Sequence, residues 1–477
     1  MKTVTLTAPN LHPDYLFWAP AWSQIRDAEI GEMMVKRKAQ VYLPRLQGHD
    51  HHQYAAYLHR AVFYNMTSKT LSALYGTMFR RDPRITLPPN LALMVGKFSK
   101  DGTSLILAAK NAAKEVLAVG RYGMLVDSRE DGAGTPYVAC YTAENILDWS
   151  VADDVTTRVV LRELYREGVQ DRARYRVLTI EPGHYEQHIY FSRDITTVPD
   201  LTGTPDELII PTVRGEVLGY IPFQFIGPFT NSPEIQKPPL LDIVSLNFAH
   251  YQSYAQLEQG RFYTANPVYT VTAGSDAKES PEYYVGPDVV WELDKDGKAA
   301  ILEFTGHGLN SLENALRQKE AQIAAISGRM MPGNTPGLSD NDAKMREANE
   351  STLLLNIADT LDEAFTKVLR WWADWNNAPA AKINKIEFEV NRDFLVRDIG
   401  AREFRAIHQM YADGVIPLSV FFEYLRKAEV IPDWLEESEF AGMLSDPAQF
   451  PNMVNVLARM RGYPDTQAYM EDQRAAA

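Results

Sequence analysis

The chain has 477 residues, of which 45% are hydrophobic and 23% charged; this supports about three folded domains and argues against disorder. Its 48 basic and 62 acidic residues leave a net charge of −14, so it lacks the basic balance of a protein that wraps DNA or RNA tightly. The single cysteine, Cys140, excludes an internal disulfide and a cysteine-based zinc site, and its neighbours Tyr137, Val138 and Tyr141 predict a buried strand position.

No apolar run approaches the roughly 20 residues that cross a bilayer. The N-terminal stretch up to Trp18 also lacks an apolar core of signal-peptide length. We therefore expect a protein without a membrane span that stays in the cytoplasm of the cell that makes it.

Residues 1–120 predict a mainly helical region, because apolar side chains recur there every three to four residues. Three stretches show this pattern: Trp22, Ile25, Ile30, Met33 and Met34; Tyr57, Ala61, Tyr64, Leu71, Leu74 and Met78; Leu105, Ala108, Ala112 and Val116. Residues 121–235 change to short apolar or alternating runs, at 124–126, 137–141, 159–165, 175–180, 188–191, 208–210 and 223–226. These runs predict an antiparallel meander and disfavour a doubly wound sheet with a Rossmann-type cofactor site.

Residues 236–338 predict two long amphipathic helices with a strand-rich insert. The first helix follows Pro238-Pro239 and is expected to end at Gly260, and the second spans about Leu309 to Ser327. The insert contains strand-like runs at 267–272, 289–293 and 300–304, and a Gly/Pro loop spans 328–338.

A third, longer helix is expected within residues 339–380. Ser339 and Asp342 form a capping-box-like start, and no Gly or Pro follows before Asn377. Its first half is polar and its second half apolar, so one end should face water or a polar lumen while the other packs. Residues 381–477 predict a strand at 386–390 and short helices at 401–413, 418–428 and 433–444. The expected fold class is therefore α+β.

The sequence contains almost no pattern typical of a catalytic site. There is no P-loop, zincin, nucleophile-elbow or kinase motif. The cluster of His49, Asp50, His51 and His52 has metal-ligand chemistry, but adjacent histidines in a polar loop are more often solvated. Gly132-Ala133-Gly134 fits a hairpin turn better than a dinucleotide loop, and Asp153-Asp154 fits a solvated surface better than a glycosidase pair. We expect no catalytic residue, no cofactor, no metal and no enzyme activity.

Several separated strings resemble one family. They are Trp22-Ser-Gln-Ile-Arg26-Asp27-Ala28 with Tyr42-Leu43-Pro44; Arg60-Ala-Val-Phe-Tyr64-Asn65-Met-Thr67; Gly120-Arg121-Tyr122-Gly123-Met-Leu-Val-Asp127; Tyr141-Thr-Ala-Glu144-Asn145-Ile-Leu-Asp148-Trp149; Leu246-Asn247 through Gln256-Leu257-Glu258; Glu303-Phe304-Thr305-Gly306; and Gly328-Arg329-Met330-Met331. In this order they resemble the portal proteins of tailed bacteriophages, the head-to-tail connector family. The resemblance covers most of residues 15 to 375. The last hundred residues contain none of these strings and are similar to the family only in general character.

The resemblance implies a ring of subunits, usually twelve, at one capsid vertex, through which double-stranded DNA enters and leaves. It assigns residues 1–120 and 121–235 to the helical and antiparallel-β parts of a wing. It assigns 236–338 to stem helices with a strand-rich, clip-like insert and a tunnel loop, 339–380 to a tunnel helix that enters the crown, and 381–477 to a strand and crown helices. The implied partners are a terminase, a major capsid or scaffolding protein and a head-tail adaptor, and the implied location is the virion.

In that setting an acidic ring would guide DNA passively, with a few basic side chains touching it weakly. The candidates are Arg329, Lys344 and Arg346, for which salt bridges such as Asp342 with Arg346 are an equal alternative. Candidate interface residues are Tyr251, Tyr254 and Trp371, for which packing inside one subunit is the main alternative. Two other functions stay open: a cytoplasmic hydrolase with an acidic cleft in the β-rich region, and another phage head or tail structural protein.

Overall fold

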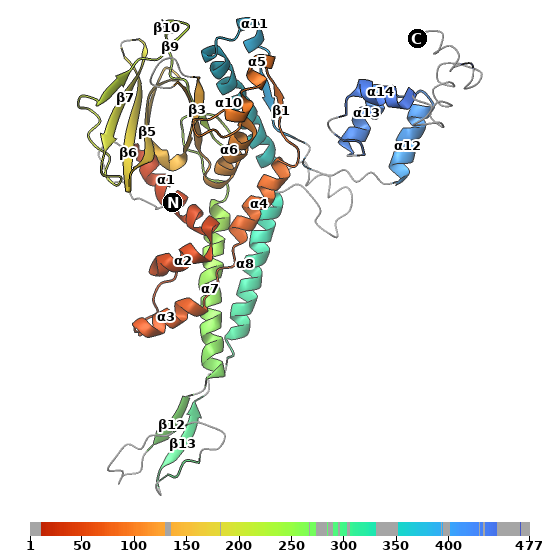
Figure 1. The fold of residues 1–477 in the computed structure, drawn as a ribbon. Coiled ribbons are helices and arrows are strands. Elements are labelled where there is room, and N and C mark those ends of the chain that lie inside the picture. The colour runs from red at the N-terminus through yellow and green to blue at the C-terminus, as the bar shows by residue number, and fades with distance from the viewer. Residues whose placement is uncertain are drawn as a thin grey trace. The chain divides into compact units, whose positions relative to one another are not determined.

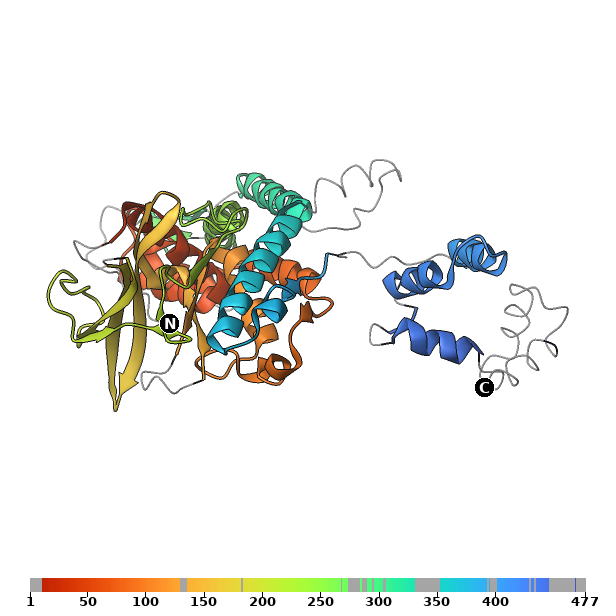
Figure 2. The same ribbon diagram turned by 90° about the horizontal axis from the view of Figure 1, so that it is seen from above.

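The computed structural model describes residues 11–128, 135–181, 183–266, 268–272, 284, 290–293, 296–302, 306–330, 352–392, 394, 401–428, 430–432, 435–445 and 468. The chain divides into two compact units, Met1–Arg392 and Asp393–Ala477. The first unit combines helices with antiparallel sheets and carries a long pair of helices, as Figures 1 and 2 show. The expected α+β class is confirmed.

The N-terminal part of the first unit is helical. Its helices are α1 (Pro13–Ile30), α2 (Glu32–Lys38), α3 (His51–Arg60), α4 (Met66–Met78), α5 (Pro89–Ala92) and α6 (Leu105–Val119), with short 3-10 turns at Ala39–Val41 and Val95–Lys97. Local signals set the ends: Asp50 and Gln53 form a capping box at α3, and Ser104 caps α6. Gly120 ends α6 in a left-handed conformation that favours glycine. The expected core positions Trp22, Leu74 and Val116 are fully buried.

Two antiparallel sheets follow. The smaller has the order β11-β2-β3, formed by β2 (Tyr122–Asp127), β3 (Tyr137–Thr142) and β11 (Phe223–Ile226). The larger has the order β4-β5-β6-β7-β8, formed by β4 (Ile146–Ala152), β5 (Val155–Glu167), β6 (Gln170–Ile180), β7 (Tyr185–Ser192) and β8 (Glu207–Ile209). A 3-10 turn at Ala143–Asn145 joins β3 to β4, and β9 (Thr212–Val213) pairs with β10 (Glu216–Val217). The antiparallel meander is thus present, whereas Cys140 is exposed rather than buried, because β3 is an edge strand.

The long helix pair consists of α7 (Leu241–Ala265) and α8 (Leu309–Met330), joined through an antiparallel hairpin of β12 (Val268–Thr272) and β13 (Lys298–Leu302) (Figure 1). Two expectations need correction. First, α7 continues through Gly260 to Ala265, since a glycine there leaves room for Leu309, whose Cδ2 would lie 2.6 Å from an added Cβ. Second, residues 290–293 lie outside any strand, and among the described residues of the insert β12 and β13 pair only with each other.

Helix α10 (Thr352–Trp375) packs its apolar face into the body of the first unit. Leu361, Phe365 and Trp372 are fully buried, and the indole N–H of Trp372 donates to the Pro136 carbonyl at 3.0 Å. Beyond α11 (Ala380–Ile383), β14 (Glu387–Glu389) pairs with β1 (Arg84–Thr86) and so returns the chain to the N-terminal helices. The polar first half expected for this helix, from Ser339 onward, lies outside the described residues.

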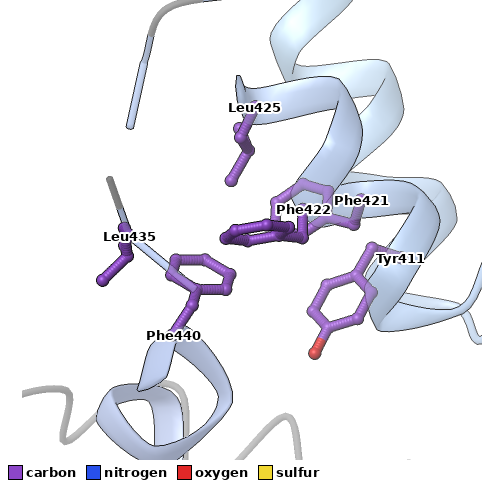
Figure 3. Packing of buried hydrophobic residues seen from close by; sticks show 6 residues of the cluster. All are labelled: Tyr411, Phe421, Phe422, Leu425, Leu435 and Phe440. Atoms are coloured by element: carbon purple, nitrogen blue, oxygen red, sulfur yellow. The ribbon is translucent and has the colours of Figure 1, made fainter. Parts of the chain in front are cut away.

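The second unit contains α12 (Ala401–Ala412), α13 (Leu418–Lys427) and α14 (Glu437–Ser445), close to the expected ranges. Their apolar faces meet in a core of their own, made by Tyr411, Phe421, Phe422, Leu425, Leu435 and Phe440 (Figure 3). Tyr411 stacks on Phe421 with ring centroids 4.5 Å apart, and Phe422 meets Phe440 at 5.3 Å. The amphipathic pattern of these short helices is therefore explained by packing among themselves.

Candidate functional site

The candidate site is the stem, which we define as α7, α8 and the β12–β13 hairpin. Its two helices bury Leu257, Leu316 and Ile323. Polar contacts join them along their length: Lys319 Nζ donates to Ser253 Oγ at 3.0 Å, and Arg261 Nη2 donates to Glu313 Oε1 at 2.9 Å. Apolar packing with polar contacts at its margin makes the pair a single rod.

The root of the stem is fixed to the body by a buried amide. The Asn247 Oδ1 accepts hydrogen bonds from the backbone N–H groups of Met66 and Thr67, both at 3.1 Å, and from the Thr67 hydroxyl at 3.0 Å. Its Nδ2 donates to the Tyr64 carbonyl at 2.9 Å. These N–H groups begin α4, where a helix has no internal acceptors, so α7 supplies them from 180 residues away in sequence.

Further contacts continue this attachment along α7. Tyr42 stacks on Phe248 with ring centroids 4.1 Å apart, and Arg60 reaches the Gln259 side chain at 2.5 Å while lying 4.1 Å over the Phe262 ring. The Thr70 and Ser327 hydroxyls are 3.0 Å apart, which ties α8 to α4. The contact of Arg60 with Phe262 is the outermost of these along α7, and residues 261–266 are exposed.

The hairpin at the far end of the stem exposes apolar side chains on both faces. Val268 and Leu302 are cross-strand partners with 60% and 61% of their surface exposed, and Tyr269 faces Ile301 at 41% and 54%. Tyr269 also meets Trp291 edge-on at 5.7 Å. A two-stranded hairpin is marginally stable alone in water. Another surface that covers these apolar side chains would stabilise it.

The strings that carry the family resemblance hold the body together. Arg26 on α1 donates to Glu144 at 2.8 Å and to Glu115 on α6 at 3.0 Å. Burial raises the pKa of the Glu115 carboxyl despite this cation. Arg121 is buried between the rings of Trp149 and Phe225, and burial lowers its pKa to about 9. These contacts join α1, α6 and both sheets, which is a structural role.

The predicted interface residues lie in different surroundings. Tyr251 has no exposed surface and packs edge-on against Phe63 at 5.7 Å, so it belongs to the core of the subunit. Tyr254 is half-buried and stacks on His250. Trp371 is half-buried and stacks on Tyr220 at 5.6 Å, with Lys367 over its ring. Tyr254 and Trp371 therefore keep surface that another subunit is able to contact.

The predicted DNA-contacting residues fall at the edge of the described chain. Arg329 belongs to the last turn of α8 rather than to a loop, because the helix continues to Met330. Nothing is described of its side chain, and Lys344 and Arg346 lie outside the described residues. Sequence reasoning missed Asn247, although a lone amide within the apolar stripe of α7 was a visible signal.

The geometry gives little support to a metal site at the histidine cluster or to a hydrolase cleft in the β-rich region. His49 packs edge-on against Tyr57 while His51 and His52 are exposed, and within the described residues no group of three His, Cys, Asp or Glu side chains is placed to hold a metal ion. The β-rich region has a concavity with Glu163 in its lining. Burial raises the pKa of Glu163, but Arg176 and Arg174 outweigh burial and lower it to about 2, which is unsuited to a general acid. No described helix has the length and apolarity to span a membrane.

Comparison with known proteins gives a partial family match and several structural likenesses. Residues 239–376 match the family "Domain of unknown function (DUF4055)", so the match covers the stem and all of α10. Among curated proteins none matches this chain.

Three solved chains are similar over most of their length. One is from the neck of a native gene transfer agent particle with C12 symmetry, at 12% identity and a TM-score of 0.42, covering 83% of this chain and 99% of that chain. A second is from the virion of a native gene transfer agent particle, at 13% identity and a TM-score of 0.41, covering 80% and 96%. A third is from the neck of an empty particle with C6 symmetry, at 12% identity and a TM-score of 0.37, covering 73% and 85%. Likeness at these values does not establish a shared function.

Proposed function

We propose that this chain is the subunit of a portal ring at one vertex of a tailed-phage-type capsid, and that DNA passes through the ring. The observation that carries the proposal is the stem: a two-helix rod fixed to the body through Asn247 at its root, with an exposed apolar hairpin at its far end. Such a rod has little use inside a monomer, whereas side-by-side copies of it form a wall. The family resemblance of the sequence supports the same assignment.

Ring closure follows from the hairpin and the half-buried aromatic residues. Val268 and Leu302 expose apolar surface, and each strand of the hairpin has one edge without a partner strand among the described residues. A neighbouring copy that covers this surface forms a head-to-tail contact, and such contacts close into a ring when the rotation between copies allows it. Tyr254 and Trp371 are the further interface candidates, and twelve copies is the number that the resemblance implies.

The exposed face of α8 fits passage of DNA rather than binding. Uncharged amides recur there at every fourth position: Asn310, Asn314, Gln318 and Gln322. In a chain with a net charge of −14, such a row offers phosphates no array of cations to bind. Arg329, Lys344 and Arg346 would provide weak contacts beyond this face. DNA would therefore slide through the ring without sequence recognition.

The partners follow from this position in a particle. A terminase would dock during packaging, a head-tail adaptor would replace it later, and the major capsid or scaffolding protein would surround the body. The protein would act in the host cytoplasm during assembly and in the virion afterwards, without catalysing a reaction.

Light scattering coupled to size-exclusion chromatography tests the assembly. The proposal predicts a particle of about twelve times the 53.9 kDa subunit mass, with a narrow distribution. A species of 53.9 kDa at high concentration would contradict it and would favour the hydrolase alternative. Filaments or sheets of open-ended mass would instead indicate a different phage structural protein.

A further inference from the structure

A concavity of about 800 Å³ lies in the β-rich part of the first unit and takes no part in the proposed channel. It is bounded by the edge strand β3, the loop around Lys100 and strands β5 to β7, and its lining includes Cys140, Arg162 and Arg174. This volume is within the range of sites that bind ligands or peptide segments. Asn145, from one of the strings that carry the family resemblance, also lines it.

The concavity contains a buried cation without a matching anion. The Arg162 side chain is 7% exposed, its Nε donates to the Asn145 side chain at 3.2 Å, and its Nη2 donates to the Glu144 carbonyl at 3.3 Å. Its Nη1 is buried without a hydrogen-bond partner, and within the described chain no carboxylate pairs with this guanidinium. A buried charge in this state is stabilised when an anion reaches it.

The neighbouring charges increase the positive character of the concavity. Glu163 is already shared by Arg174, Arg176 and, at 3.9 Å, Lys100. The Asp101 carboxylate already accepts a hydrogen bond from the Thr103 backbone N–H at 3.1 Å. The lining therefore has an excess of cations in a chain whose net charge is −14, which makes it a local site for an anionic partner.

The edge of β3 offers backbone groups in the same place. Val138 uses its outer N–H to reach the Phe98 carbonyl at 3.0 Å, and its carbonyl accepts from the Lys100 N–H at 3.3 Å. Because backbone direction alternates along a strand, the N–H and C=O of Cys140 also point away from β2, on the side of the concavity. No contact described for Cys140 occupies these two groups. An open strand edge of this kind accepts an extended peptide as a further strand.

We propose that this concavity binds an extended acidic segment of another polypeptide, which pairs with the edge of β3 at Cys140 and places a carboxylate against Arg162. Two independent features support one occupant: the guanidinium without a paired carboxylate selects negative charge, and the open N–H and C=O of Cys140, next to the occupied groups of Val138, select extended backbone. The inference does not require ring formation, so it stands or fails separately from the proposed channel.

A fluorescein-labelled hexapeptide of alternating Val and Glu, blocked at both ends, is the probe, and its binding to the full chain is followed by anisotropy. We expect Arg162→Gln to weaken binding at least tenfold, which is about 1.4 kcal/mol. Lys100→Gln, at a half-exposed position, should weaken it about threefold. The matched control is Arg172→Gln, whose guanidinium pairs with Glu167 outside the lining and should leave binding unchanged. A thermal melt of each variant separates lost binding from lost folding.

Cys140 provides an independent readout because it is the only cysteine of the chain. The bound peptide should slow its labelling by a maleimide, whereas a peptide with Lys in place of Glu should not. A peptide methylated on alternate backbone nitrogens should bind at least tenfold more weakly, because it cannot extend the sheet.

Equal binding of the Lys peptide, or an unchanged affinity of both Arg162→Gln and Lys100→Gln, would overturn the proposal. Inorganic phosphate is also added at a concentration that supplies as much negative charge as the Glu side chains of the peptide. Displacement of the peptide under this condition would overturn the proposal in favour of a small-anion site.

Discussion

The amide oxygen of Asn247 accepts two hydrogen bonds from Thr67, one from its backbone N–H at 3.1 Å and one from its hydroxyl at 3.0 Å. This contact joins the root of the stem helix α7 to the first turn of α4. It attaches the rod to the body, and its bonds to Met66 and Thr67 are buried. The stem therefore moves with the body rather than as a separate arm.

Asn247→Leu removes this attachment while keeping a side chain that is branched at Cγ. We expect a loss of about 2 to 4 kcal/mol in the free energy of unfolding, because the buried N–H and hydroxyl of Thr67 lose their shared acceptor, while the Met66 N–H keeps only the Tyr64 carbonyl at 2.8 Å. Urea denaturation measures the change. Gln252→Leu is the matched control. Within the described chain Gln252 donates a single bond, to the Tyr42 carbonyl, from a partly exposed position, so the substitution should cost under about 1 kcal/mol. Equal effects of the two substitutions would show that Asn247 has no special role.

Val268→Ser combined with Leu302→Ser tests the hairpin as an assembly surface. Both side chains are mostly exposed, so the subunit should fold normally while the concentration needed for assembly rises at least tenfold, because apolar contact between copies is lost. Sedimentation velocity over a dilution series measures this. Val169→Ser is the control, because Val169 is 85% exposed but lies outside the stem. Assembly that is as strong in the double variant as in the native chain would remove the hairpin from the interface.

Replacing Arg329, Lys344 and Arg346 together by Ala tests weak DNA contact. Rings should form as before, whereas the amount of DNA packaged or retained per particle should change severalfold, because cations near the path of the phosphates are lost. Quantifying protected DNA after nuclease treatment measures the effect. Arg45→Ala, at an exposed position on the body, serves as the control. Unchanged packaging would mean that the three side chains do not touch DNA.

Asp362 makes stability depend on pH. Burial raises the pKa of its carboxyl to about 7, although the Val390 N–H and the Arg392 guanidinium act in the opposite direction. A raised carboxyl pKa means that the folded chain holds a proton that the unfolded chain releases, so the contribution to stability is complete below about pH 4 and is lost as pH rises through 7. Asp362→Asn removes this dependence.

The free energy of unfolding of Asp362→Asn minus that of the native chain should therefore rise between pH 5 and 7, by at most about 1.4 kcal/mol per pH unit, and level off above pH 8. Urea denaturation at several pH values measures the difference, in which the other titrating groups largely cancel. Asp359→Asn is the control, since this carboxylate is mostly exposed beside the same Arg392. A difference that stays constant or falls with pH would contradict the raised pKa.

Periodicity predicted the elements well where each has one buried face. The stem helices, the β-meander and the C-terminal helices follow directly from apolar spacing, because burial of a stripe or a strand face sets the pattern. It failed where tertiary contact decides. Gly260 lies within a helix because Leu309 packs against it, and Cys140 is exposed because β3 ends its sheet. No sequence signal marks such partners.

The candidate site was predictable in outline but not in its contacts. The two rods and their strand-rich insert were visible from the sequence, whereas the burial of Tyr251 depends on Phe63 from the connection between α3 and α4. Arg162 illustrates the same limit, since an arginine in a strand is ordinary until the absence of a paired carboxylate is known. Long-range neighbours, rather than local propensity, give these residues their meaning.

Electron microscopy of the purified chain tests the central claim most directly. Axial views should show a closed ring of about twelve subunits around an opening wide enough for duplex DNA, with the stem helices forming the wall. Particles without a central opening, or a ring in which the α7–α8 stem points away from the axis and lines no channel, would contradict the account.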